Sequence, residues 1–108
     1  MRNNAVATQL KRAEDALDKN DLQAARALAE SLLAREPGQG RARLVAGICA
    51  QRGGRLVDAE HYFRRALVAT QEDVDAIYRL ALVFCEQRNF SAALPFIEHA
   101  VAHDSNDA

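Results

Sequence analysis

Apolar residues recur along the chain every three or four positions, which is the spacing of one face of an α-helix. No stretch alternates apolar and polar residues over the length of a strand, so the pattern predicts an all-α fold. The stripe of one such helix consists of Ala25, Leu28, Ala29, Leu32 and Leu33. Turn residues interrupt the pattern at Asn20-Asp21, Pro37-Gly38, Gly53-Gly54 and Arg88-Asn89. Between them the pattern predicts six helices, over residues 4–19, 22–35, 40–52, 56–70, 74–87 and 91–103.

The pattern repeats itself with a period of 34 residues. Nearly every aligned column is apolar, and one column holds Ala25, Ala59 and Ala93. A fixed period of this length indicates a supersecondary unit that buries its apolar face by stacking on its neighbours. We expect a single domain over 1–108, with repeats at about 6–39, 40–73 and 74–107. Candidate N-caps, which would bond the free amides of the first helical turn, are Asp21, Asp73 and Ser91.

The second repeat carries the most specific residues. Small or aromatic side chains stand there at five spaced positions, namely Gly47, Gly54, Ala59, Phe63 and Ala66, and Pro37 closes the repeat before it. This arrangement resembles the tetratricopeptide repeat (TPR), a helix-turn-helix unit of the same period. The resemblance covers almost the whole chain, and it implies a right-handed α-solenoid of three repeats and six helices. The chain departs from the family early in each first helix, where Gln9, Arg43 and Ile77 replace a large aromatic residue.

The same resemblance implies that the first helix of each repeat lines a concave surface, and that function there is binding of a protein or peptide. The candidate contact residues combine apolar and charged side chains; they are Leu10, Glu14, Arg41, Leu44, Ile48, Arg52, Asp75, Tyr78, Leu82 and Glu86. Such a surface suits an amphipathic helix or an extended peptide with apolar anchors. We expect Leu44 and Tyr78 to be the central anchors, whereas Ile48 and Leu82 equally fit packing between neighbouring helices.

The last helix has no following repeat to cover it. We expect Leu94, Phe96 and Val101 to form an open edge, covered either by a continuation of the chain or by a second copy of it.

Three interpretations of function follow. The leading one is a protein-interaction scaffold of a bacterial type. The others are a non-catalytic N-terminal region of a larger bacterial enzyme, such as a transferase, and a self-assembling structural module.

Charge changes this picture little. The net charge of −1 divides into 0 over residues 1–37, +4 over 38–71 and −5 over 72–108, which could orient a partner or reflect an ordinary solvated surface. The basic cluster of Arg52, Arg55, Arg64 and Arg65 has no aromatic stacking platform, so we expect no nucleic acid partner. The chain start lacks the apolar core of a signal peptide, and no run approaches the roughly 20 apolar residues of a membrane span. We therefore expect a cytoplasmic protein without membrane contact.

The sequence offers no catalytic residue and no cofactor motif, so we expect that the chain is not an enzyme. His99 and His103 stand four residues apart, as two metal ligands on one helix do, but no third ligand follows and we predict no metal site. Cys49 and Cys85 match neither a metal knuckle nor a disulfide framework, and we expect two free thiols.

Overall fold

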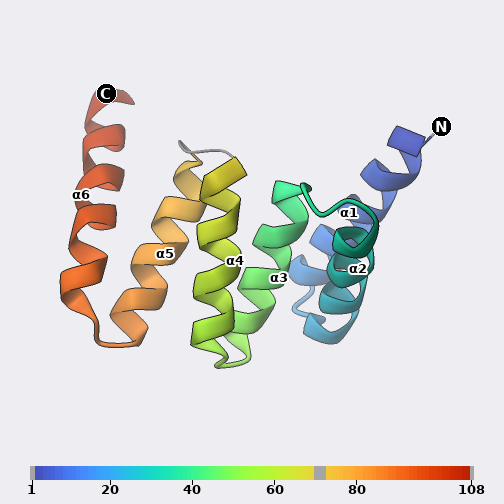
Figure 1. Ribbon diagram of the computed structural model, residues 1–108, viewed down its shortest axis with the longest axis horizontal. Coiled ribbons are helices and arrows are strands. Elements are labelled where there is room, and N and C mark those ends of the chain that lie inside the picture. The colour runs from blue at the N-terminus through green and yellow to red at the C-terminus, as the bar shows by residue number, and fades with distance from the viewer. Residues whose placement is uncertain (1, 70–72, 108) are drawn as a thin grey trace.

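The computed structural model describes residues 2–69 and 73–107, and the side chains of 5–68 and 73–102. These residues form a right-handed α-solenoid of three helix-turn-helix repeats, without a strand in the described ranges (Figure 1). Its six helices are α1 (Arg2–Asp18), α2 (Leu22–Arg35), α3 (Gly40–Arg52), α4 (Leu56–Ala69), α5 (Val74–Glu86) and α6 (Phe90–Asp107). Among the described residues, no helix combines the length and hydropathy that crossing a bilayer requires.

The helix ends agree closely with the predicted ones. The largest difference is at the last helix, which continues to Asp107 instead of ending at residue 103. The first helix begins at Arg2, two residues before its predicted start. The predicted end of the fourth helix, Thr70, lies outside the described residues. The 34-residue period therefore predicts the order of the helices correctly, and it predicts the length of each helix except the last to within two residues.

The turn inside each repeat has the same backbone geometry. Asn20, Gly54 and Arg88, spaced by the repeat period, have positive φ angles of 59°, 79° and 61°. The amide of the residue that follows each one donates to a helical carbonyl five residues earlier, at 2.8 Å in all three turns. This is the Schellman arrangement, in which a left-handed residue ends a helix and satisfies its last carbonyls. It reverses the chain and starts the second helix of each pair.

Side-chain caps begin four of the helices, and the cap of α3 is Gln39, whose Oε1 accepts from the amide of Arg41 at 3.3 Å. The carboxylates of Asp21 and Asp73 each accept from the backbone amide three residues further on, at 3.2 Å, which confirms two of the predicted N-caps. The prediction for Ser91 is wrong because α6 already begins at Phe90. Its cap is Asn89, whose Oδ1 accepts from an amide in the first turn at 3.3 Å.

Each helix packs against the next one in the chain, and α1 also contacts α3 (Figure 1). The largest fully buried side chains are those of Phe63, Phe84, Leu32, Leu80 and Val83. They lie on α2, α4 and α5, so the core runs through the stack instead of being confined to one helix pair. The stacking places α1, α3 and α5, the first helices of the three repeats, in consecutive positions along the array.

Candidate partner-binding surface

The predicted partner-binding residues lie on α1, α3 and α5. One column of this surface holds Leu10, Leu44 and Tyr78, one residue in each repeat. Leu10 is only 4% exposed because it packs with Leu32 and Ala42, whereas Leu44 is half-buried and Tyr78 is 54% exposed. Exposure of the side chains in this column therefore increases along the stack, from the buried Leu10 to the exposed ring of Tyr78.

A second column of the surface holds Glu14, Ile48 and Leu82. Ile48 is buried within the main core, and Leu82 is half-buried. Ile48 and Leu10 thus stabilise the packing of the helices and offer little surface to a partner. The accessible apolar part of the predicted surface consists of Tyr78 with contributions from Leu44 and Leu82.

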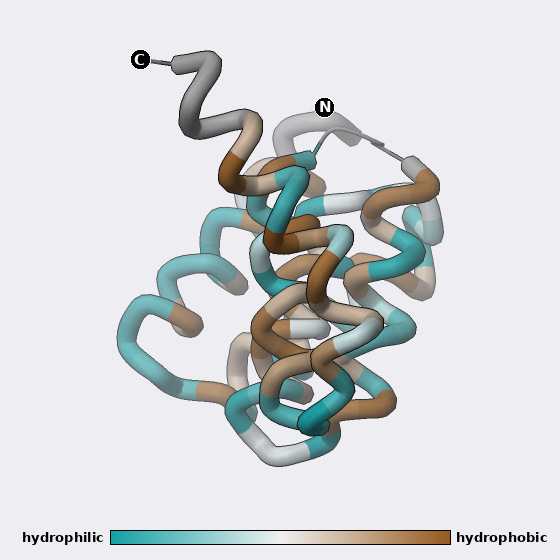
Figure 2. Tube along the Cα trace, turned by 90° about the vertical axis from the view of Figure 1, so that its left-hand side faces the viewer, coloured by the Kyte–Doolittle hydropathy of each residue, from teal (hydrophilic) through white to brown (hydrophobic). Residues whose placement is uncertain are grey.

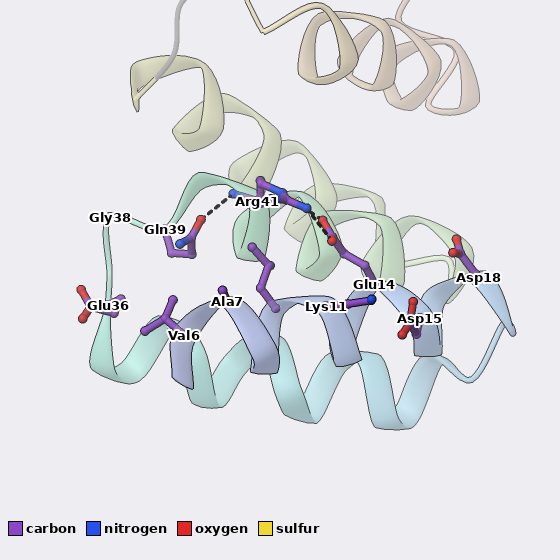
Figure 3. Close-up of a pocket in the computed structure, with 11 residues that line it drawn as sticks. Val6, Ala7, Lys11, Glu14, Asp15, Asp18, Glu36, Gly38, Gln39 and Arg41 are labelled. Carbon is purple, nitrogen blue, oxygen red and sulfur yellow. Dashed lines mark hydrogen bonds and ion pairs between the residues drawn. The ribbon is translucent and has the colours of Figure 1, made fainter. Parts of the chain in front are cut away.

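Three of the predicted charged residues, Glu14, Arg41 and Asp75, form ion pairs within the chain. The guanidinium of Arg41 donates twice to the carboxylate of Glu14, at 3.1 and 2.6 Å, and so joins α3 to α1 (Figure 3). Arg79 donates to Asp75 at 3.1 Å, one turn away on α5. Both pairs are solvent-exposed, so each stabilises the fold by about 1 kcal/mol or less. Their main effect is to leave this part of the surface close to neutral.

The remaining charged residues also bond to neighbouring helices. Arg52 donates to the carbonyl of Leu17 at 3.2 Å and to Oδ1 of Asn20 at 3.3 Å, which ties the end of α3 to the end of α1. Glu86 accepts a hydrogen bond from the side chain of Gln51, which ties α5 to α3. All five charged residues predicted to contact a partner therefore bond within the chain, and four of them, all except Asp75, connect different helices of the array.

An open hollow of about 1080 Å³ lies between α1 and the α2–α3 loop. Figure 3 shows Glu36, Gly38 and Gln39 of the loop facing the side of α1 that carries Val6 and Ala7. The lining is rich in carboxylates, contributed by Glu14, Asp15, Asp18 and Glu36, and its cations are Lys11 and Arg41. The hydrophobic pattern does not indicate this hollow, because it depends on the path of the loop across α1.

The open edge of the last helix differs in part from the prediction. Leu94 and Val101 are exposed as expected, but Phe96 is half-buried and packs on Phe84, with ring centroids 5.7 Å apart. Phe90 and Ile97, which were not among the predicted edge residues, are exposed instead. The exposed face of α6 is therefore rotated relative to the predicted one.

The thiols and histidines form no visible reactive centre in the described part of the chain. Both cysteines are free, and Cys49 is buried with its Sγ 3.7 Å from the carbonyl oxygen of Leu22. Burial raises the pKa of the Cys49 thiol, so its thiolate fraction at neutral pH is smaller than usual. Within the described residues, no group of three potential ligands lies together as a metal site requires. His99 is exposed, and the side chain of His103 lies outside the described residues.

Comparison with known proteins agrees with this architecture. The tetratricopeptide repeat family model matches residues 10–74 and 50–108, which together include most of the chain. The chain belongs to the tetratricopeptide repeat family. Proteins of this family are generally non-catalytic scaffolds for protein–protein interaction. Among curated proteins, none matches the chain in sequence.

Three solved structures illustrate the likeness. A MamA variant superposes with a TM-score of 0.83 at 18% identity over 93% of this chain, and an O-GlcNAc transferase variant of Thermobaculum terrenum with 0.89 at 20% over 94%. YrrB, described as a TPR protein with an unusual peptide-binding site, gives 0.84 at 26% identity over 92%. The chain spans 55%, 20% and 51% of these three structures, respectively. At identities below 25%, the first two show a common fold only.

Proposed function

We propose that this chain is an interaction scaffold that binds a peptide or helical segment of another protein on the concave face of α3 and α5. The observation that carries the proposal is Tyr78, a large aromatic side chain that is 54% exposed on a first helix. Membership of the TPR family supports a binding role. The unusual peptide-binding site described for YrrB, which is 26% identical, supports a peptide as the ligand.

The surroundings of Tyr78 favour a ligand with spaced apolar side chains. Leu44 and Leu82 are half-buried, so each still presents some apolar surface on the same succession of helices. Tyrosine is enriched among residues that dominate binding energy, because its rigid ring buries a large area while its hydroxyl can still bond. The charged residues of the surface already have partners within the chain, so we expect their effect on affinity to be secondary. We propose no catalytic step and no cofactor for this site.

The proposal can be tested with peptides selected from a random display library on the purified chain. Tyr78→Glu should weaken the binding of selected peptides at least about tenfold, because it removes an apolar anchor worth about 1.4 kcal/mol or more and adds a charge. Val57→Glu is the matched control, since Val57 is 62% exposed and lies on α4, a second helix. Fluorescence anisotropy gives both affinities. Equal affinities for the two variants would place the binding surface elsewhere.

The main alternative is a non-catalytic repeat region at the start of a larger bacterial enzyme, such as a transferase. The superposition with the O-GlcNAc transferase variant fits this alternative, but at 20% identity it concerns the fold alone. A reading frame that ends soon after Ala108 would contradict it. The cytoplasmic location, the single domain over 1–108 and its repeats at 6–39, 40–73 and 74–107 remain predictions from the sequence.

A further inference from the structure

A continuous apolar stripe lies on the outer face of α6. It consists of Phe90, Leu94, Ile97 and Val101, which are 63%, 53%, 39% and 59% exposed. Figure 2 looks onto this end of the stack, where apolar positions recur along the terminal helix. The spacing of four, three and four residues places all four side chains on one face, as in a helix that pairs with another helix. We call these four residues the α6 stripe.

The earlier repeats show which part of such a face another repeat covers. The residues equivalent to Phe90, Ile97 and Val101 are buried or half-buried there; they are Leu22 and Leu56, Ala29 and Phe63, and Leu33 and Leu67. The residues equivalent to Leu94 are Arg26 in α2 and Glu60 in α4. Each forms an ion pair one turn along its own helix, Arg26 with Glu30 at 2.6 Å and Glu60 with Arg64 at 2.9 Å. A further repeat stacked on α6 in the same way would therefore cover Phe90, Ile97 and Val101 and leave Leu94 partly in water. The apolar residue at the fourth position, Leu94, favours an occupant that covers all four residues of the α6 stripe.

The other end of the stack does not complement the α6 stripe. Arg12 and Asp15 of α1 are exposed, and they stand where α5, two repeats along the same columns, has the buried Leu80 and Val83. Docking α6 of one copy on this face of α1 in the next copy would bury two charged side chains against apolar ones. Such burial without compensating partners is unfavourable, so head-to-tail stacking of copies is disfavoured.

We propose that the α6 stripe is the contact between two copies of this chain, which pair α6 to α6 in antiparallel orientation about a two-fold axis. With the two-fold axis between Leu94 and Ile97, Leu94 of one copy faces Ile97 of the other, and Phe90 of one copy faces Val101 of the other. Every residue of the stripe thus meets an apolar residue of the other copy, and the stripe is self-complementary. A two-fold contact uses the same surface on both copies and closes after two, so it produces a dimer and no filament.

Charge favours the antiparallel orientation over the parallel one. Between residues 90 and 102, the one formally charged side chain is that of Glu98. In a parallel pair the two Glu98 carboxylates would stand at the same level and repel each other. In the antiparallel pair they are displaced by about 7.5 Å along the helix axis, because five residues separate their levels and each residue rises about 1.5 Å. Because four side chains per copy make a small contact, the dimer is weak and depends on concentration.

Light scattering on a sizing column tests the dimer. Over about 1 to 500 µM, the expected mass rises from the 11.9 kDa of the chain to twice that value. Leu94→Glu should weaken self-association at least about tenfold because it would bury a carboxylate in the contact. The Val57→Glu variant, changed at an exposed residue of α4 outside the stripe, should dimerise like the original chain. Circular dichroism of both variants verifies that the helices are retained.

Cross-linking with a short bismaleimide tests the orientation. In a Cys85→Ser background, a mixture of Phe90→Cys and Val101→Cys chains should give mainly mixed cross-linked pairs, since these positions face each other in the antiparallel arrangement. Identical positions of the two copies would lie roughly 16 Å apart along the helix axis. Cross-links mainly between identical variants would overturn the antiparallel assignment. A strict monomer at the highest concentration, a dimer that Leu94→Glu leaves unchanged, or masses that grow beyond two chains would each overturn the proposed contact.

Discussion

The contact between Gly47 and Phe63 gives the sharpest prediction about stability. A Cβ atom added at Gly47 in α3 would lie 2.5 Å from Cε1 of Phe63 and 2.9 Å from two further ring carbons. The Phe63 ring is fully buried in the main core, so it has no open space into which it can turn. The close approach of α3 and α4 therefore depends on the absence of a side chain at residue 47.

Two effects of Gly47→Ala oppose each other. Replacing a glycine inside a helix by alanine favours the helix by about 1 kcal/mol. The added methyl group, however, lies about 1 Å inside the usual carbon–carbon contact distance, and overpacking of this kind costs about 1 to 3 kcal/mol. Because the ring cannot leave, we expect an overpacking cost in the upper part of that range, about 2 to 3 kcal/mol, and therefore a net loss of about 1 to 2 kcal/mol. For a chain of this size, such a loss lowers the melting temperature by roughly 5 to 15 °C.

Urea and thermal unfolding followed by circular dichroism measure this loss. Gly40→Ala is the matched control in the same helix, because a Cβ there meets nothing within 4 Å, and it should be neutral or slightly stabilising. Adding Phe63→Leu to Gly47→Ala should cost less than the sum of the two single changes, since a smaller side chain makes room for the methyl group. A Gly47→Ala variant as stable as the original chain would refute the reasoning, because helix propensity would then outweigh the contact.

Three further predictions follow from the turns, the thiols and the surface ion pairs. Arg88→Gly should raise the free energy of unfolding by about 0.5 to 1 kcal/mol in urea titrations, because it relieves a side chain from a left-handed backbone conformation at φ 61°. Cys85 should react with a maleimide faster than Cys49 in the folded chain, and unfolding should abolish the difference, as mass spectrometry of labelled peptides can show. Removing the Glu14–Arg41 pair by Arg41→Ala should cost less than about 1 kcal/mol in the same titrations, and added salt should reduce this cost.

The period of the sequence predicted the helices because each repeat must bury the same stripe in the same way. The turns illustrate this point, since three different residues, Asn20, Gly54 and Arg88, adopt one backbone geometry at one position of the repeat. A glycine or asparagine favours that geometry locally, but an arginine does not. In the third repeat, the packing of the two flanking helices therefore determines the turn against the local preference of Arg88.

Exposure was predicted less well than helix position. A periodic pattern indicates the face of a helix on which a residue lies, but it does not tell how closely the next helix approaches that face. Leu10 is buried because Leu32 and Ala42, on the two neighbouring helices, close over it. Phe96 is half-buried because it reaches the Phe84 ring of the preceding helix. Each of these contacts joins residues that occupy different positions of the repeat. A comparison of residues 34 apart therefore did not reveal them.

The two proposed surfaces lead to a joint prediction about avidity. Tyr78 lies on α5, whereas the α6 stripe lies on the outer face of the following helix, so pairing through α6 gives one assembly with two peptide-binding surfaces. Such an assembly should hold a surface densely coated with peptide more tightly than a single chain does, by up to about a hundredfold. Leu94→Glu should therefore leave the affinity for one free peptide unchanged in fluorescence anisotropy, while it accelerates dissociation from the coated surface.

The free peptide distinguishes two explanations for an effect of Leu94→Glu. A loss of affinity for free peptide would mean that α6 belongs to the binding surface itself, because avidity cannot change a one-to-one interaction. Unchanged dissociation from the coated surface, at concentrations where the original chain is dimeric, would mean that the dimer does not present both sites to one surface. Tyr78→Glu should give the opposite pattern. It should weaken binding both to the free peptide and to the coated surface, and it should leave the mass of the dimer unaltered.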